Sequence, residues 1–253
     1  DIIEKGLASG GIDWPPLPLM MRTMAHGAFD GVPDAVTPPE LTMAQRFALD
    51  PFANAISVVV LLIMLGVVGL VVEVSFRRGG AGIAPWPAWS LPVLIAIGLT
   101  IAAYLSFVEV TDTAAVCGPV GDCNTVQQSE YARLFGVLPI GILGILGYTA
   151  LGMSWLLGSF GPAALRMAAR LSLWGMALLG VLFSIYLTFL EPFVIGATCA
   201  WCLSSAIVMT LILMAVTPIA RPALRERFGP GRATARTAAG TEEADPEPAA
   251  TEG

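Results

Sequence analysis

The 253-residue sequence contains four cysteines in two pairs, and their spacing is that of thiol chemistry. Cys199 and Cys202 stand three apart in "CAWC", directly before a long apolar run. Thiols three apart share one side of a helix start and can close a small disulfide ring. The partial positive charge of a helix N-terminus stabilises a thiolate, which makes the first cysteine the better nucleophile. The spacing favours redox or metal chemistry, while a structural disulfide or two buried apolar cysteines stay open.

The second pair, Cys117 and Cys123, is separated by five residues that include two glycines and a proline. A flexible loop of this kind can present one thiol outward and carry the other towards "CAWC". Two pairs predict a relay in which one pair meets an external dithiol and the other meets an oxidant in the membrane. Each step would be thiol–disulfide exchange by thiolate attack.

Zinc is the competing use of four cysteines. The Cys117–Cys123 spacing with its Gly-Pro insert makes a poor zinc knuckle, and the sole histidine, His26, is distant in the sequence. Two purely structural disulfides are the other alternative, although a buried helical bundle of this size needs no cross-links. We therefore expect no metal, and we expect His26 to be an ordinary loop residue.

The composition is that of a membrane protein. Hydrophobic residues make up 56% of the chain, charged residues only 13%, and the mean hydropathy is +0.76. A soluble domain is normally about one quarter charged. The net charge of −6 comes from the tail and loops, and the lack of a basic stripe argues against nucleic acid as a partner.

Five apolar runs approach the roughly 20 residues that a helix needs to cross a bilayer. Because only helices and closed barrels span lipid, continuous runs of this length predict an all-α integral membrane protein. The runs are Phe52–Val72, Leu91–Val110, Val137–Gly158, Leu171–Leu190 and Ala200–Val216.

Arginines predict the orientation of these spans, because positive charge accumulates on the cytoplasmic side. Arginines follow spans one, three and five, which fall on one side if the spans alternate: Arg77, Arg78, Arg166, Arg170, Arg221, Arg225, Arg227, Arg232 and Arg236. The N-terminus and both cysteine pairs are then outside the cytoplasm, where a disulfide can persist. We expect a multi-pass protein of the cell inner (cytoplasmic) membrane, with its C-terminus in the cytoplasm.

The chain divides into four predicted parts. Residues 1–51 form an outer Pro/Gly-rich segment, either short amphipathic pieces at a surface or partner, or an ordinary linker. Residues 52–76 hold an extra transmembrane helix, and residues 90–217 form the core. Residues 218–253 form a cytoplasmic tail, which is expected to be disordered beyond Phe228. The start at Asp1 rather than Met fits a removed or missing upstream segment.

The order "C-x5-C … S … YA-x-x-FG-x-x-P-x-G-x-x-G-x-x-GY … C-x-x-C" resembles the vitamin K epoxide reductase family, especially its bacterial members. The resemblance covers about 90–216. It rests on Cys117, Cys123, Ser129, Tyr131, Ala132, Phe135, Gly136, Pro139, Gly141, Gly144, Gly147, Tyr148, Cys199, Ala200, Trp201 and Cys202.

The resemblance implies a four-helix bundle that holds a quinone of the menaquinone or ubiquinone type and takes electrons from an outer thioredoxin-like partner. By position, Cys202 is the thiol next to the quinone and Cys199 is its partner. Cys117 and Cys123 are the loop shuttle, with Cys123 the one that reaches Cys199. The Ser129 hydroxyl is expected to stabilise the loop helix or to take part in the chemistry next to the quinone. The alternative is that Ser129 is only a helix cap.

Departures from the family narrow the expected substrate and partner. Animal members carry a tyrosine four residues after the last cysteine, where this chain has Ala206, and their quinone-contacting asparagine has no counterpart near Val137. Vitamin K epoxide is therefore poorly supported as a substrate. The tail is too short and polar for the thioredoxin-like domain that some bacterial relatives carry after the bundle, so the partner is expected to be a separate protein or to be encoded upstream of Asp1. The alternative function is a non-catalytic accessory or assembly subunit of a larger membrane complex.

Three further features bear on the chemistry. Reducing a quinone takes two protons, and Glu191 is a candidate for the proton path, although we favour a plain interfacial carboxylate at the end of a span. Glycines 141, 144 and 147 allow either close helix packing or room for a flat ring. Trp201 is expected to shield the disulfide from water or to contact the partner.

Overall fold

The computed structural model describes residues 41–76, 83–118, 121–134 and 136–228. The chain divides into two units, Asp1–Leu41 and Thr42–Gly253, and every described helix and strand belongs to the second unit. His26, Phe135, residues 1–40 and the tail beyond Phe228 lie outside the described residues, so the expectations for them stay untested.

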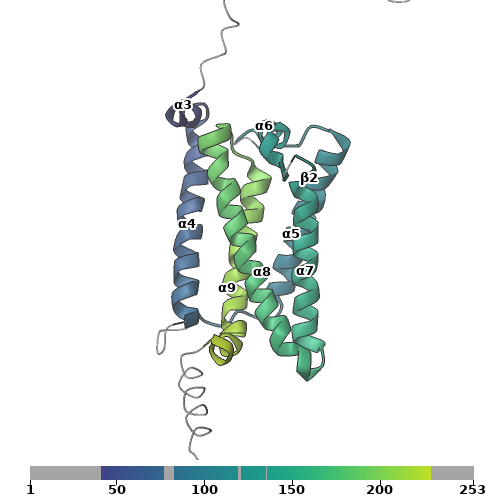
Figure 1. Ribbon diagram of the computed structural model, residues 1–253. Coiled ribbons are helices and arrows are strands. Elements are labelled where there is room, and N and C mark those ends of the chain that lie inside the picture. Colours follow the sequence, from purple (N-terminus) through teal and green to yellow (C-terminus); the bar gives the residue numbers. More distant parts are fainter. Residues whose placement is uncertain (1–40, 77–82, 119–120, 135, 229–253) are drawn as a thin grey trace, which may run out of the picture. The chain divides into compact units, whose positions relative to one another are not determined.

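Five helices of the described residues are long and apolar enough to cross a membrane, as the sequence predicts. This makes the chain a multi-pass membrane protein (Figure 1). The helices are α4 (Pro51–Phe76), α5 (Ser90–Thr111), α7 (Ile140–Phe160), α8 (Ala163–Leu190) and α9 (Ala200–Phe228).

Two helix boundaries differ from the sequence prediction. Helix α8 begins eight residues before Leu171, in a stretch rich in the strong helix formers Ala, Leu, Met and Arg. Helix α9 continues through Pro218 and Pro222, so residues 218–228, which the sequence analysis placed in the cytoplasmic tail, are helical. Burial explains this, since Ala220 and Leu224 are 0% and 2% exposed in the bundle core.

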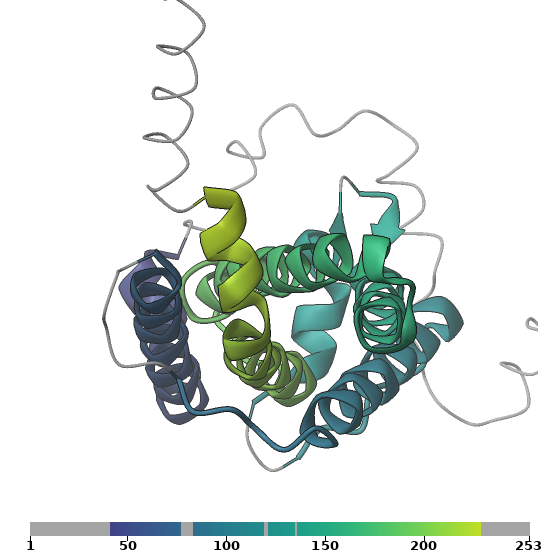
Figure 2. The same ribbon diagram turned by 90° about the horizontal axis from the view of Figure 1, so that it is seen from below.

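Four helices form the bundle, and the fifth packs on its outside. Neighbours in the bundle run α5–α7–α8–α9, and α9 closes the ring by packing on α5. Helix α4 packs against α8 and α9 (Figure 2). This arrangement confirms the predicted four-helix core with one additional N-terminal helix.

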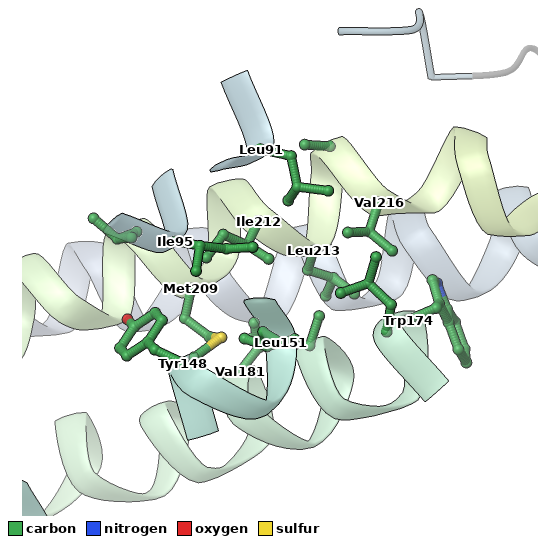
Figure 3. Close-up of a cluster of buried hydrophobic side chains, with 14 of the residues drawn as sticks. Leu91, Ile95, Tyr148, Leu151, Trp174, Val181, Met209, Ile212, Leu213 and Val216 are labelled. Atoms are coloured by element: carbon green, nitrogen blue, oxygen red, sulfur yellow. The ribbon is translucent and has the colours of Figure 1, made fainter. Parts of the chain in front are cut away.

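The core of the bundle is apolar and is built from all four of its helices. Tyr148 is 1% exposed, and a Cβ on Gly98 would overlap its ring, so glycine allows α5 and α7 to approach closely. Figure 3 shows the residues at its centre: Leu91, Ile95, Tyr148, Leu151, Trp174, Val181, Met209, Ile212, Leu213 and Val216.

A short helix, α3 (Met43–Phe47), precedes α4 and packs on the turn that follows α8. That turn, η2 (Glu191–Ile195), is a π-helical turn that ends at Gly196, whose φ is +83°. Arg46 donates a hydrogen bond to the Val194 carbonyl, and the Phe47 and Phe193 rings stack at 6.3 Å. Helix α3 therefore holds the turn that leads to Cys199.

The segment between α5 and α7 lies at the same end of the bundle as η2 (Figure 1). It contains α6 (Cys123–Gln128), η1 (Glu130–Ala132) and a two-stranded antiparallel hairpin, β1 (Arg133–Leu134) and β2 (Leu138–Pro139). Arg133 pairs with Pro139 and Leu134 with Leu138. Asp112, with φ +49°, ends α5 and begins this segment.

Candidate active site

The CxxC pair lies at the start of α9, as its spacing predicts. Cys199 immediately precedes the helix, and its carbonyl accepts the Leu203 N–H at 2.9 Å. The Cys199 sulfur accepts the Cys202 N–H at 3.3 Å. A side chain in this position does the work of an N-cap, with sulfur in place of the usual oxygen.

The surroundings of Cys199 favour its thiolate. A hydrogen bond from the Cys202 side chain lowers the pKa of Cys199 below its ordinary value, and the backbone N–H groups of Cys202 and Trp201 add to this effect against the cost of burial. A thiolate is the attacking species in disulfide exchange. The same stabilisation makes Cys199 a good leaving thiolate in disulfide exchange, although it is 0% exposed.

Cys117 and Cys123 form a disulfide, with their Cα atoms 5.9 Å apart. Cys123 is the first residue of α6, and the preceding residue, Asp122, caps this helix by accepting the N–H groups of Asn124 and Thr125 at 3.1 Å. The Thr125 hydroxyl bond lowers the pKa of Asp122, with help from the two backbone donors. Cys123 is 0% exposed, while Cys117 is partly exposed.

The disulfide loop is tied to the CxxC helix by Trp201. The indole N–H donates to the Val116 carbonyl at 2.9 Å, and the ring lies 4.7 Å from that of Tyr104 on α5. The Tyr104 hydroxyl in turn accepts the Val116 N–H at 2.8 Å. Trp201 thus fixes the residue next to Cys117. The sequence analysis expected Trp201 to shield the disulfide or to contact a partner, and it did not expect this role.

All four cysteines belong to one cluster at this end of the bundle. Cys123 and Cys199 are its buried members, together with Val108, Ala115, Val126 and Ala197. Cys117 and Cys202 are partly buried and pack against this cluster. Cys199 and Cys202 are both free thiols, so one pair is oxidised while the other is reduced.

Beneath Cys202, a cavity of about 340 Å³ opens between α7, α8 and α9. Most of its lining is apolar, and the few polar groups include Glu191, Tyr148 and Ser205. The Tyr148 hydroxyl is 3.0 Å from Ser205 Oγ, which orients both groups at the wall. A site of this size and polarity is typical of small-molecule binding.

Glycines 141, 144 and 147 of α7 line this cavity, and the space around them differs. A Cβ on Gly141 would crowd Ser106 and Glu109 of α5, and one on Gly144 would meet the Ala102 Cβ at 3.0 Å. A Cβ on Gly147 meets nothing within 4 Å. The first two glycines therefore serve close helix packing, and the third leaves open space.

Ser129 does not line the 340 Å³ cavity, which is called the large cavity below to distinguish it from the smaller one beside it. It lines this smaller cavity of about 40 Å³, which it shares with Glu109, Tyr131, Glu191 and Cys202, and also a polar cavity of about 540 Å³ that does not include Cys202. Its hydroxyl donates to the Val126 carbonyl at 2.7 Å, at the C-terminal end of α6. The local helix-end role is thus present, and a role towards a ligand stays a prediction.

Glu191, which the sequence analysis favoured as a plain interfacial carboxylate at the end of a span, is buried within the protein. It is 2% exposed, its Oε2 accepts the Cys199 N–H at 3.3 Å, and the same oxygen lies 3.2 Å from the Ser57 hydroxyl oxygen. It stands at the start of the π-helical turn η2 and contacts α4 through Ser57, so it is not a carboxylate exposed on the surface of the bundle. Glu191 lines both cavities beside Cys202.

Sequence reasoning missed three polar residues near Cys199. Asn54 and Ser57 on α4 and Thr198 before Cys199 are all 0–2% exposed and are joined by hydrogen bonds. The available signal was the pair of polar residues three apart in the otherwise apolar "FANAIS" of the first span. Such spacing places both on one helix face.

Within the described ranges, no group of three His, Cys, Asp or Glu side chains is placed to hold a metal ion. The arrangement contains two thiol pairs, an adjoining cavity and a buried carboxyl group. These groups can carry out thiol–disulfide exchange and can pass electrons to a ligand in the cavity.

Comparison with known proteins agrees with this chemistry. Residues 89–217 match the family model described as the vitamin K epoxide reductase family, over just more than half of the chain. The match spans α5 to most of α9 and leaves out α3 and α4. No curated protein matches the chain.

Proposed function

The chain belongs to the vitamin K epoxide reductase family, and we propose that it passes electrons from an extracytoplasmic dithiol protein to a membrane quinone. By this activity it would support disulfide formation in other proteins. The observation that carries the proposal is the placement of both cysteine pairs in one cluster, with Cys202 opening on the cavity. A thioredoxin-like protein is the expected donor, since the family resemblance implies one.

The outer step uses the difference in exposure between Cys117 and Cys123. A dithiol partner can reach the sulfur of Cys117, which is partly exposed, but not that of Cys123, which is 0% exposed. Attack on Cys117 breaks the disulfide and releases the Cys123 thiolate. The second thiol of the partner then attacks the mixed disulfide, so the partner leaves oxidised and the loop pair is reduced.

The inner step passes the electron pair to the CxxC cysteines. The Cys123 thiolate attacks the Cys199 sulfur of an oxidised Cys199–Cys202 pair, and Cys202 leaves as a thiolate. Cys117 then closes the loop disulfide again and frees Cys199.

The cavity fits a flat, mainly apolar electron acceptor. Its volume of about 340 Å³ is at the lower end of small-ligand sites, which begin at about 300 Å³. A quinone bound there would accept two electrons and two protons. Cys202 would face it, Tyr148 and Ser205 offer it hydroxyl groups, and Ser129 remains a candidate contact from the adjoining small cavity.

The test uses the four single Cys→Ser variants in lipid nanodiscs, with a reduced thioredoxin-like donor and a short-chain quinone. Cys117→Ser should lose capture of the donor, while chemically reduced Cys199–Cys202 is still oxidised by quinone. Cys123→Ser should leave Cys117 as a lone thiol with no disulfide for the donor to reduce, while chemically reduced Cys199–Cys202 is still oxidised by quinone. Cys199→Ser and Cys202→Ser should both abolish quinone reduction from any thiol source.

Two outcomes would contradict the proposal. Near-normal electron flow in all four variants would make the cysteines structural. A wild-type chain that keeps both pairs but passes no electrons from any dithiol would favour the accessory-subunit alternative.

A further inference from the structure

A chain of buried polar side chains links α4 to Glu191. Thr198 Oγ1 donates to Asn54 Oδ1 at 3.0 Å, and Ser57 Oγ lies 3.1 Å from Thr198 Oγ1 and 3.2 Å from Glu191 Oε2. Asn54 and Ser57 are 0% exposed, and Thr198 and Glu191 are 2% exposed. Buried polar atoms need partners, so the hydrogens available to this chain can be counted.

The count starts at Asn54, whose amide orientation is fixed. Its Nδ2 donates to the carbonyls of Phe47 at 3.1 Å and Gly196 at 3.5 Å, so Oδ1 must be an acceptor. The single hydroxyl hydrogen of Thr198 is used in the bond to Asn54. The contact between Ser57 and Thr198 therefore needs the one hydrogen of Ser57.

The contact between Ser57 and Glu191 then lacks a hydrogen unless Glu191 supplies it. With an ionised Glu191, Ser57 can donate to the carboxylate or to Thr198, but not to both. With a protonated Glu191, the acid O–H donates to Ser57, Ser57 to Thr198, and Thr198 to Asn54. The Cys199 N–H still has a lone pair of Oε2 to bond, so each contact of the chain then has the one hydrogen that it needs.

Glu191 also lies where a proton is needed. It is the only carboxylic acid among the described residues that line the large cavity, and it shares that wall with Cys202. Its Oε2 accepts the backbone N–H of Cys199, so Glu191 also contacts the other cysteine of the CxxC pair. The carboxyl group is therefore within reach of the thiol pair and of the cavity at the same time.

From the hydrogen count and this position, we propose that Glu191 stores and transfers a proton during quinone reduction, and that Asn54, Thr198 and Ser57 hold the proton on it. The proposal rests on the proposed function. Glu191 gives its proton to a quinone oxygen as the two electrons leave the dithiol. It regains a proton from the Cys199 thiol as the Cys199–Cys202 disulfide closes, and the Cys202 proton goes to the second quinone oxygen. The dithiol thus supplies two electrons and two protons in total, and Glu191 ends unchanged.

The proposal gives α4 a part in the chemistry. Asn54 and Ser57 are positioning residues on a helix that lies outside the family match, and they act on the reaction through Glu191. In this chain the additional helix is therefore a component of the redox site and not only a membrane anchor.

The first test is infrared spectroscopy of the dithiol-reduced full chain in nanodiscs, taken as the difference between wild type and each variant in the same redox state. The carbonyl stretch of a protonated carboxylic acid should be present in the wild type and lost in Glu191→Gln. Ser57→Ala should shift or remove it. The matched control is Ser75→Ala, which changes a serine on the same helix that is 1% exposed and has no hydrogen-bond partner among the described residues, and the band should stay unchanged.

The second test is single-turnover quinone reduction by the prereduced protein. Glu191→Gln should slow the transfer about 100-fold or more, in the range for a lost general acid, with little change in the quinone concentration that gives half the maximal rate. Exchange between the two cysteine pairs should keep its wild-type rate, which shows that the variant is folded. Ser57→Ala should slow the transfer several-fold, and Ser75→Ala should not.

The outcomes separate this inference from the proposed function. Wild-type protein that reduces no quinone contradicts the proposed function, whatever the spectrum shows. Wild-type protein that reduces quinone while Glu191→Gln keeps its rate, or keeps the carboxylic acid band, overturns the proton store. Equal effects of Ser57→Ala and Ser75→Ala would overturn the role of α4.

Discussion

Filling the cavity next to Gly147 should weaken quinone binding without disturbing the thiol chemistry. Gly147 lines the cavity, and a Cβ added there meets no atom within 4 Å, so Gly147→Leu places four carbons in open space. Leucine is also the better helix former by up to about 1 kcal/mol, so we expect α7 to fold normally.

The size of the effect follows from the cavity volume. At about 340 Å³ the cavity has little spare room for a ligand ring and part of its tail. Four carbons from leucine displace about as many ligand carbons, and each buried carbon is worth about 0.8 kcal/mol. The loss of about 3 kcal/mol predicts an affinity roughly two orders of magnitude weaker.

The assay is steady-state quinone reduction with the thioredoxin-like donor, and the matched control is Gly175→Leu. Gly175 is on α8, also has nothing within 4 Å of an added Cβ, and does not line the cavity. We expect KM for quinone to rise about 100-fold in Gly147→Leu and to stay unchanged in Gly175→Leu. Exchange between the donor and Cys117–Cys123 should be normal in both. An unchanged KM in Gly147→Leu would refute the placement of the quinone in this cavity.

Two other predictions concern Cys199 and the orientation. Because the pKa of Cys199 is lowered by its hydrogen bond from Cys202, the ultraviolet absorbance of its thiolate, measured as the difference between wild type and Cys199→Ser, should be half developed at a pH below the ordinary thiol value of about 8.5. Cys202→Ala should move that midpoint upward, and a wild-type midpoint above the ordinary thiol value would contradict the geometry. The end of the bundle away from the cysteines carries five arginines at the start of α8 and the end of α9: Arg166, Arg170, Arg221, Arg225 and Arg227. Protease digestion of sealed vesicles should therefore find the residues after Arg221 on the cytoplasmic side. The opposite result would reverse the proposed topology.

The sequence predicts the helices and the CxxC helix start because these depend on local properties. A run of about 20 apolar residues can satisfy its backbone in lipid only as a helix or in a closed barrel, so the five spans follow from composition and length. The end of α9 depends on tertiary packing. Pro218 and Pro222 predict a stop, but the buried Ala220 and Leu224 hold the helix in place beyond them.

The polar network around Glu191 could not be predicted, because it joins residues more than 130 positions apart. Ser57 and Glu191 are separated by 134 positions, and Asn54 and Thr198 by 144. Local sequence indicates only that Asn54 and Ser57 share a face of an apolar helix. It does not show that α4 packs on η2 and the Cys199 loop, which is what buries these groups.

The burial of the four cysteines gives the proposed relay a direction. Cys117 is partly exposed on the loop side and Cys202 on the cavity side, while Cys123 and Cys199 between them are 0% exposed. Since exchange requires one sulfur to reach another, small thiols and oxidants in solution can act only on the two ends. The middle step is then reserved for Cys123 and Cys199, which lie in the same buried cluster. The link from Trp201 to Val116 holds the loop against α9, and in the proposed relay this would keep the outer dithiol and the quinone from exchanging electrons directly.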